Sequence, residues 1–281
     1  MASQLVALPA VERLSPRCIR ILGGNPGKFT LQGTNTYLVG TGKQRILIDT
    51  GEGRPAWATS LKATLEQENA TIVSALISHW HPDHVGGIKD LLSLTPEASI
   101  FKNNPGAGQS TISDGQVFST EGATLTAAHT PGHTIDHMAF VLAEEDAMFT
   151  GDNVLGQGTA VYEDLATYLS SLDKMRHLFK GWAYPGHGPV VEDGPAKIVE
   201  YIEHRKQREE QVASTLRPTQ DPKAVPWTAL QVVKVMYSDV PEELHAAARG
   251  GVLQILAKLE AEGKVVQVGP DSWRLAPSSS L

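Results

Sequence analysis

The sequence predicts a mixed α/β domain followed by a small module of helices and a hairpin. Short runs rich in Ile, Val and Leu end at Gly, Asp or Asn, which is typical of strands. Apolar residues recur at helical spacing between several of these runs. A polar stretch with three prolines, RPTQDPKAVP (217–226), marks a linker. We therefore expect two domains, over residues 1–217 and 218–281.

The first half of the chain predicts three strands, a helix and a fourth strand. Between its last two strands, Trp57, Leu61 and Leu65 have the spacing of one helical face. The predicted strands are 17–22, 35–40, 45–51 and 71–78.

The second half again predicts strands followed by helices, and after the linker it predicts a small, mainly helical module. Strands are predicted at 98–103, 116–120, 123–130, 137–143, 146–152 and 181–186. Helices are predicted at 84–94, around 163–179 and from about Pro195 to Leu216. After the linker, two helical stretches (227–240 and 242–263) and a hairpin (264–275) predict a winged-helix-like module.

Composition limits the class of protein. With 281 residues and 41% hydrophobic content, the chain can bury a large core. Its single cysteine, Cys18, excludes an intrachain disulfide and a multi-cysteine zinc site. The start of the chain resembles neither a signal nor a transit peptide, and no stretch is long enough to span a membrane. We expect a cytoplasmic location without membrane contact, and the net charge of −7 disfavours broad nucleic-acid binding.

The most informative motif is HWHPDH, which places His79, His81, Asp83 and His84 within six positions. Residues two apart on a strand project to the same side, and a turn can bring the next two side chains back toward them. Three more candidate ligands follow predicted strand ends or turns: His133 in HTPGHT, Asp152 in FTGD and His187 in YPGHG. These seven side chains are enough for two divalent ions about 3.5 to 4 Å apart, with Asp152 bridging them.

Such a site predicts hydrolysis without a serine or cysteine nucleophile. Two ions lower the pKa of a bound water toward neutrality and polarise a carbonyl or phosphoryl oxygen. Asp83 can orient the resulting hydroxide or take its proton, so it is the candidate catalytic residue. A thiol has a pKa of about 8.5, so a thiolate departs from the acyl group almost without the help of an acid. The site therefore favours thioesters as substrates. Imidazole and carboxylate ligands suit zinc, and also manganese or iron.

Together with LIDTG (47–51), these motifs resemble the metallo-β-lactamase superfamily over roughly residues 15–215. The resemblance implies a four-layer αββα sandwich with the metals at one edge of two packed sheets. It implies that Asp49 supports the histidine loop through hydrogen bonds. It also implies a division of the ligands, in which Asp152 bridges a first ion held by His79, His81 and His133 and a second held by Asp83, His84 and His187.

Two groups within this superfamily share longer stretches with the chain. GDNVLGQGTAVYEDLATYLSSL is similar to stand-alone thioesterases that release aromatic polyketides, such as an atrochrysone-type chain, from fungal synthases. EGATLTAAHTPGHTIDHMAF is shared with them and with the β-lactamase-like endoribonucleases. The first resemblance implies a polyketide acyl substrate on an acyl carrier protein as partner.

Two alternatives stay open: a single-strand-specific endoribonuclease and another small-molecule ester or thioester hydrolase. A basic stretch, HRKQRE (204–209), does not separate the carrier-protein thioesterase from the endoribonuclease, because it suits an acidic carrier protein and an RNA backbone equally. Asn35 and Thr36 of GTNTY and Tyr162 are candidate substrate contacts, since they are expected to lie near the metals. We expect the C-terminal module to pack beside the metal cleft or to form a homodimer interface.

Overall fold

The computed structural model describes residues 5–221, 223–238 and 245–276. The chain forms two compact units: residues up to 163 together with 167–199, and residues 164–166 together with those from 200 onward. The division falls inside helix α5 (Gly194–Thr215), whereas the sequence prediction placed all of this helix in the first domain. The difference has a physical reason, because the second half of α5 pairs with helix α7: Lys258 Nζ lies 2.7 Å from Glu209 Oε2.

The first unit contains a seven-stranded sheet in sequential order. Its first four strands pair antiparallel, and β4 to β7 pair parallel. The strands are β1 (Val11–Ser15), β2 (Cys18–Leu22), β3 (Asn35–Val39), β4 (Gln44–Ile48), β5 (Thr71–Ile77), β6 (Ser99–Lys102) and β7 (Ser110–Thr111). Strand β1 and the two-residue β7 were missed by the sequence prediction, because neither carries an alternating apolar pattern.

A five-stranded sheet has the order β12-β11-β10-β9-β8. Its pairs are antiparallel except for β11 and β12, which run parallel. The strands are β8 (Val117–Thr120), β9 (Ala123–His129), β10 (Met138–Leu142), β11 (Ala147–Gly151) and β12 (Ala183–Pro185), with the short 3-10 helix η1 (Ala143–Glu145) between β10 and β11. Asp152 and His187 therefore follow the ends of two neighbouring parallel strands.

The two sheets pack face to face because alternate residues of their strands are apolar on the inner side. Tyr37 of β3 and Ile46 of β4 are buried in one core cluster with Leu125 of β9 and Phe140 of β10. The Tyr37 and Phe149 rings meet edge to face, with centroids 5.0 Å apart. This cluster fixes the sandwich whose edge carries the predicted ligands.

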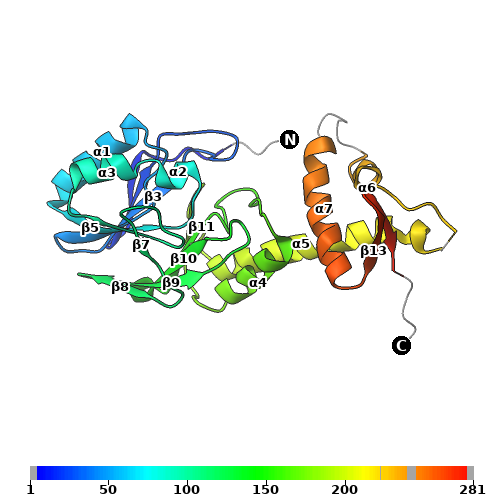
Figure 1. Cartoon of the computed structure of the whole chain (residues 1–281). Helices are drawn as coiled ribbons and strands as arrows, with labels where there is room; N and C mark the ends of the chain where they lie inside the picture. Colours follow the sequence, from blue (N-terminus) through cyan, green and yellow to red (C-terminus); the bar gives the residue numbers. More distant parts are fainter. Residues whose placement is uncertain (1–4, 222, 239–244, 277–281) are drawn as a thin grey trace. The chain divides into compact units, whose positions relative to one another are not determined.

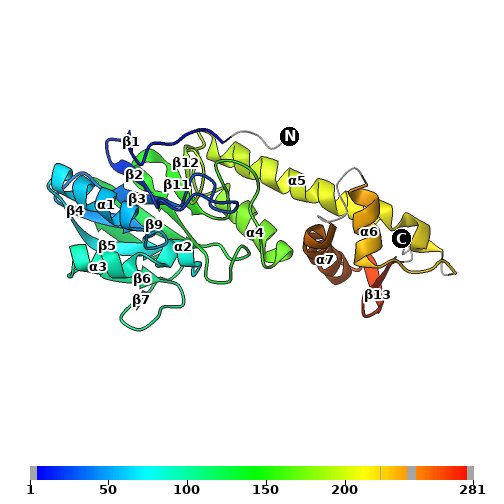
Figure 2. The ribbon, with the colours of Figure 1, turned by 90° about the horizontal axis from the view of Figure 1, so that it is seen from above.

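Helices cover the outer face of each sheet. On the larger sheet, α1 (Pro55–Glu68) and α3 (Ile88–Leu94) bury Trp57, Leu61 and Leu91 against the alternate set of strand residues, such as Leu38 and Leu47. On the smaller sheet lies α4 (Leu165–Met175), whose Ser171 hydroxyl donates to the Pro131 carbonyl. Figures 1 and 2 show these layers. The predicted four-layer arrangement is confirmed.

The predicted helix over 84–94 forms as two shorter helices. Helix α2 (Pro82–Val85) ends at Gly86, and α3 begins after Gly87. A Cβ on Gly87 would lie 2.0 Å from the Thr50 carbonyl oxygen, so only glycine permits this close turn. The break leaves Asp83 and His84 on a separate short helix beside the metal-binding edge.

The second unit contains helices α6 (Ala229–Met236) and α7 (His245–Ala261) and the hairpin of β13 (Val265–Gly269) and β14 (Ser272–Leu275). Thr228 caps α6 through a reciprocal pair of hydrogen bonds with Gln231. The backbones of Trp227 and Trp273 form two hydrogen bonds, at 2.9 and 2.8 Å. These bonds join the segment before α6 to strand β14. A 3-10 turn, η2 (Arg217–Gln220), occupies part of the predicted linker. None of the helices in the described ranges is both long and apolar enough to cross a bilayer.

Candidate metal centre

The histidine loop follows the carboxyl end of β5. His81 is the N-cap of α2, and Pro82 occupies the first helical position, where its missing N–H costs no hydrogen bond. The backbone N–H of His84 then donates to the His81 carbonyl at 2.9 Å. This tight turn brings the second half of the motif back toward His79.

A first group of four donors lies around the imidazoles of His79, His81 and His133. His81 Nδ1 is 2.9 Å from His79 Nε2 and 3.1 Å from His133 Nε2. The two Nε2 atoms of His79 and His133 are 3.3 Å apart, and Asp152 Oδ2 completes the group. Donors of one tetrahedral zinc ion lie roughly 3.3 Å apart when each bond is near 2.0–2.1 Å, so these spacings fit a cation.

A second group contains Asp83, His84 and His187. Asp83 Oδ2 lies 3.3 Å from the Nε2 atom of each histidine. Asp152 lies between the two groups: its Oδ2 is 3.2 Å from His187 Nε2 and 3.7 Å from His133 Nε2. This division of donors is the one that the sequence resemblance implied.

Two buried polar atoms of the site have no hydrogen-bond partner, which also indicates a position for a cation. His84 Nε2 and Asp152 Oδ1 are buried without a hydrogen-bond partner, and they lie 3.4 Å apart. Unsatisfied buried polar atoms are rare in folded proteins and cost stability. A bound cation gives both atoms a partner, so the donor set is able to hold metal.

Hydrogen bonds on the far side of the rings direct three imidazoles inward. His84 Nδ1 donates to Asp49 at 2.7 Å, His79 Nδ1 to the Ser78 hydroxyl at 2.9 Å, and His133 Nδ1 to the Val161 carbonyl at 2.7 Å. With Nδ1 protonated, each Nε2 keeps its lone pair for a metal. Asp49 also accepts from the N–H and hydroxyl of Ser78, at 2.7 and 2.8 Å. The contact of Asp49 with the histidine loop agrees with its predicted supporting role.

Burial and the neighbouring charged groups set the pKa values of the donor side chains. Burial disfavours the charged form of His84, yet the carboxylates of Asp152 and Asp49 raise its pKa well above the ordinary value. Burial likewise opposes the charge of Asp152, but His187 and His84 hold its pKa well below the usual range. His79 shows the opposite balance: burial, followed by the neighbouring His84, lowers its pKa.

Comparison with known proteins decides the family. Residues 29–187 match the metallo-beta-lactamase superfamily, and residues 228–273 match the beta-lactamase associated winged helix domain. The chain belongs to the metallo-β-lactamase superfamily. The predicted family and the winged-helix-like character of the C-terminal module are both confirmed.

Similar proteins of this superfamily come from fungi. The chain is 48% identical over 279 residues to the atrochrysone carboxyl ACP thioesterase of Aspergillus chevalieri, covering 96% of this chain and 91% of the relative. It is 47% identical over 270 residues to the lactamase-like protein nscB of Arthroderma gypseum, covering 92% and 86%.

Solved structures of the superfamily share the fold. A beta-lactamase domain protein from Burkholderia ambifaria matches with a TM-score of 0.80 at 18% identity, over 97% of this chain and 95% of that protein. A family protein from Thermus thermophilus matches with a TM-score of 0.75 at 22% identity, over 94% and 100%.

A pocket of about 410 Å³ opens onto both donor groups. Five of the predicted ligands line it: His81, Asp83, His133, Asp152 and His187. Its other walls come from residues 28–31 and from a loop between β11 and α4, which contributes Leu155, Ala160 and Val161. The cleft therefore combines the candidate metal ligands with five apolar residues, Phe29, Leu31, Leu155, Ala160 and Val161, and with the polar Lys28, Thr30, Gln157 and Thr159.

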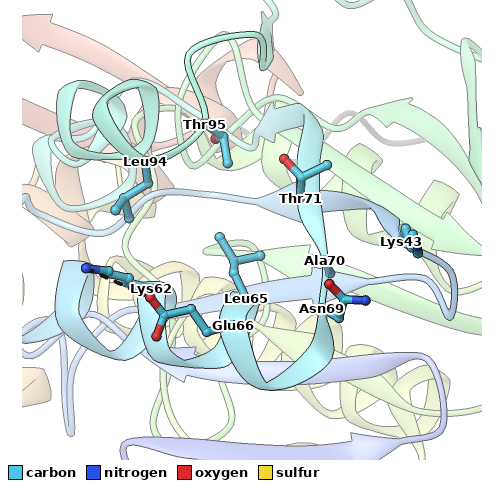
Figure 3. A pocket seen from close by; sticks show the side chains of 9 residues that line it. All are labelled: Lys43, Lys62, Leu65, Glu66, Asn69, Ala70, Thr71, Leu94 and Thr95. Carbon is cyan, nitrogen blue, oxygen red and sulfur yellow. Dashed lines mark ion pairs between the residues drawn. The ribbon is translucent and has the colours of Figure 1, made fainter.

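A different pocket, of about 640 Å³, lies between the ends of α1 and α3 (Figure 3). Lys43 and Thr71 line it just before and at the start of two strands whose opposite ends carry Asp49 and the histidine loop. None of the predicted ligands lines this pocket.

The structure does not bring two of the predicted substrate contacts into the cleft. Asn35 and Thr36 are buried, with 1% and 0% of their surface exposed. Asn35 Nδ2 donates to the carbonyls of Pro185 and Gly188, at 2.9 and 2.8 Å, so it holds the His187 turn. The Thr36 hydroxyl donates to the Ile21 carbonyl and accepts from Trp57 Nε1. Because both side chains are buried and hydrogen-bonded within the protein, the structure does not support the predicted contact of Asn35 and Thr36 with substrate.

Tyr162 lies next to the cleft without lining it. Its ring is half-buried and stacks on Tyr168, with centroids 5.4 Å apart. Its neighbour Val161 is the residue that lines the cleft. The contact of Tyr162 with substrate stays a prediction.

Sequence reasoning assigned no role to His137, which the structure places beside the bridging carboxylate. The ring is fully buried, and burial lowers its pKa well below the ordinary value. Its Nε2 accepts from the backbone N–H of Asp152 at 3.1 Å, and Nδ1 lies 3.0 Å from the Thr130 hydroxyl. The only available signal was its position four residues after His133, which by itself is not distinctive.

Metal binding is expected to release protons at pH 7, and metal affinity is expected to fall as the pH decreases below about 9. Burial lowers the pKa of His187, but Asp152 outweighs burial and raises it to about 9. A cation must displace the proton from this imidazole and from that of His84. Calorimetric titration with zinc in buffers of different ionisation enthalpy counts these protons. A binding constant that does not change from pH 7 to pH 9 contradicts the prediction.

Proposed function

We propose that the protein hydrolyses the thioester that joins a polyketide acyl chain to an acyl carrier protein. The proposal depends on one observation: imidazole and carboxylate donors converge at a cleft that is also lined by apolar side chains. The relative from Aspergillus chevalieri, named as an ACP thioesterase, supports a carrier-bound substrate.

The seven donors support two divalent ions, and we propose zinc, with manganese or iron as alternatives that elemental analysis can separate. A pair of such ions supplies Lewis acidity to the thioester carbonyl and makes water acidic enough to act as the nucleophile near neutral pH. Asp83, whose side chain is 20% exposed at the cleft, is positioned to orient that water and take its proton.

Apolar side chains at the cleft suit the acyl chain. Phe29 is 70% exposed and Val161 is 62% exposed, although both line the cleft. Covering apolar surface stabilises a complex by about 25 cal/mol per Å² removed from water. These two side chains therefore have the most apolar surface to remove from water when a large apolar acyl group fills the cleft.

The leaving group is consistent with a thioester. Outside the predicted ligands, Lys28 is the only residue with an ionisable side chain among those that line the described cleft. An amine leaving group needs protonation before it departs, whereas a thiolate does not. The cleft thus suits a substrate that needs little help from a general acid.

The structure provides little support for carrier docking on the basic stretch 204–209. Arg205 is buried, and the Arg208 guanidinium lies 5.2 Å from the centre of the Tyr237 ring. Glu209 accepts from Lys258 at 2.7 Å. The exposed positive charge of this stretch is therefore limited to Lys206 and the half-buried Arg208, and a docking site for the carrier protein is not proposed there. The homodimer and the cytoplasmic location stay predictions.

A direct comparison of substrates tests the proposal. Purified, metal-loaded protein is offered an acyl carrier thioester and, separately, a single-stranded RNA, with His81→Ala as the inactive control. Thioester cleavage without RNA cleavage is expected. RNA cleavage alone makes the protein an endoribonuclease, and inactivity toward both with metal bound identifies a different small-molecule hydrolase; either result overturns the proposal.

Replacing Asp83 by asparagine is expected to lower kcat by at least about 100-fold, because general-base catalysis contributes roughly 10²- to 10⁴-fold. Asparagine keeps the volume and one ligand oxygen but cannot take a proton. Steady-state kinetics on the carrier thioester measure the change, and elemental analysis of the same sample reports the metal content. Full activity with both ions retained rejects the catalytic role of Asp83.

A further inference from the structure

The loop that connects β2 and β3 folds around a buried asparagine. Asn25 is 7% exposed, and its backbone carbonyl accepts from the Thr30 hydroxyl at 2.6 Å. A Cβ on Gly23 would lie 2.7 Å from Asn25 Oδ1, and one on Gly33 would lie 3.3 Å from the same atom. Glycine at both positions therefore leaves room for the asparagine amide.

The amide of Asn25 holds Thr34 at two points. Thr34 N–H donates to Asn25 Oδ1 at 2.9 Å, and Asn25 Nδ2 donates to the Thr34 hydroxyl oxygen at 3.0 Å. The hydroxyl has a single proton. Because its oxygen already accepts from Asn25, that proton is directed to the remaining neighbour, Asp83 Oδ2, at 2.9 Å.

The Asp83 oxygen that Thr34 contacts is the one that faces the two histidines of the second donor group. Asp83 Oδ2 lies 3.3 Å from the Nε2 atoms of both His84 and His187. The backbone of Thr34 also forms a β-bridge with His187. Thr34 is fully buried, so it cannot contact a substrate in the cleft.

We propose that Thr34, held by Asn25, is a positioning residue that fixes which oxygen of Asp83 faces the second metal position. This inference rests on the proposed metal-dependent function. A single carboxylate can otherwise rotate about its Cβ–Cγ bond, and its χ2 wells are broad. The hydrogen bond from Thr34 selects one orientation, as partners of metal ligands generally do.

The hydroxyl can be removed without changing the volume of the side chain. Thr34→Val keeps the shape and loses the donor, whereas Thr34→Ser keeps the donor. Thr64→Val is a matched control: Thr64 is 5% exposed on α1, and its hydroxyl donates to the Ser60 carbonyl at 2.8 Å, away from both donor groups. A general loss of a buried hydroxyl affects Thr34→Val and Thr64→Val alike.

Titration of the metal-free protein with Co²⁺, followed by its visible absorption, measures the two sites without any assay of activity. The wild type and Thr64→Val are expected to bind two ions. Thr34→Val is expected to bind the second ion about 10- to 100-fold more weakly, and Thr34→Ser is expected to bind within a few-fold of the wild type. With the carrier thioester, Thr34→Val is expected to lower kcat and leave KM unchanged.

Asn25→Asp provides a second test if Thr34→Val does not fold. The carboxylate still accepts from Thr34 N–H but offers no donor to the hydroxyl, which can then turn away from Asp83. We expect weaker binding of the second Co²⁺ here as well. Equal second-site affinity in the folded variants and the wild type overturns the inference. A wild type that binds no Co²⁺ overturns the metal-dependent function itself, so the two failures are distinguishable.

Discussion

Thioester hydrolysis is expected to fall by more than about 100-fold when Asp152 is replaced by asparagine, since even partners outside the ligand set cost 10- to 100-fold. Asp152 is the carboxylate shared by both donor groups: Oδ2 lies 3.7 Å from His133 Nε2 and 3.2 Å from His187 Nε2. Asparagine keeps the size of the side chain but removes its negative charge and one acceptor oxygen. Both ions then lose a shared ligand, and metal content is expected to fall together with activity.

Kinetics on the carrier thioester and elemental analysis of the same preparation check this prediction. Asp173→Asn is the matched control, because Asp173 is exposed on α4 and pairs with Arg176 at 2.8 Å. The control is expected to keep the wild-type rate and metal content. An Asp152→Asn protein that retains two ions and full activity rules out the bridging role.

Replacing Asp49 by asparagine is expected to destabilise the fold by about 3 kcal/mol, since a buried donor left unpaired costs about 1–3 kcal/mol and bonds to charged groups cost more. Asp49 is 2% exposed and accepts from three donors: two on Ser78 and Nδ1 of His84. An amide offers one acceptor oxygen and turns its NH₂ group toward donors. The inward orientation of His84, and with it the second metal position, is expected to be lost.

Urea unfolding with and without zinc measures the effect. Asp146→Asn is the matched control, because Asp146 also has a positive φ, of 48° against 59° for Asp49, but is exposed. Asparagine tolerates this left-handed backbone, so any difference between the two variants reports the buried hydrogen bonds. Equal unfolding free energies for Asp49→Asn and the wild type refute the prediction.

The winged-helix-like module illustrates a limit of sequence reasoning at a domain boundary. The proline-containing stretch 217–226 was predicted to separate two domains; η2 lies within it, and α6 follows it. The contact between Glu209 and Lys258 nevertheless joins the second half of α5 to the second unit. A helix that continues across a boundary has no composition break, so its division is invisible in the sequence.

The sequence alone determined the fold class, the superfamily and a set of seven donors that the structure brings together. It could do so because His79, His81, Asp83 and His84 are close in the chain, and because His133, Asp152 and His187 each follow a recognisable strand end or glycine turn. Local spacing and strand periodicity carry this information.

Only the tertiary structure decided which residues support those donors. Asn35 and Thr36 were expected at the substrate but are buried, whereas Thr34, His137 and the Val161 carbonyl contact the donors or their backbone. Each of these contacts joins residues at least 15 positions apart (Thr34 and Asp83 are separated by 49), and depends on strand register and loop path. A shift of one residue in a strand exchanges its two faces, so the side that a side chain occupies is fixed by packing between the sheets rather than by its neighbours in the chain.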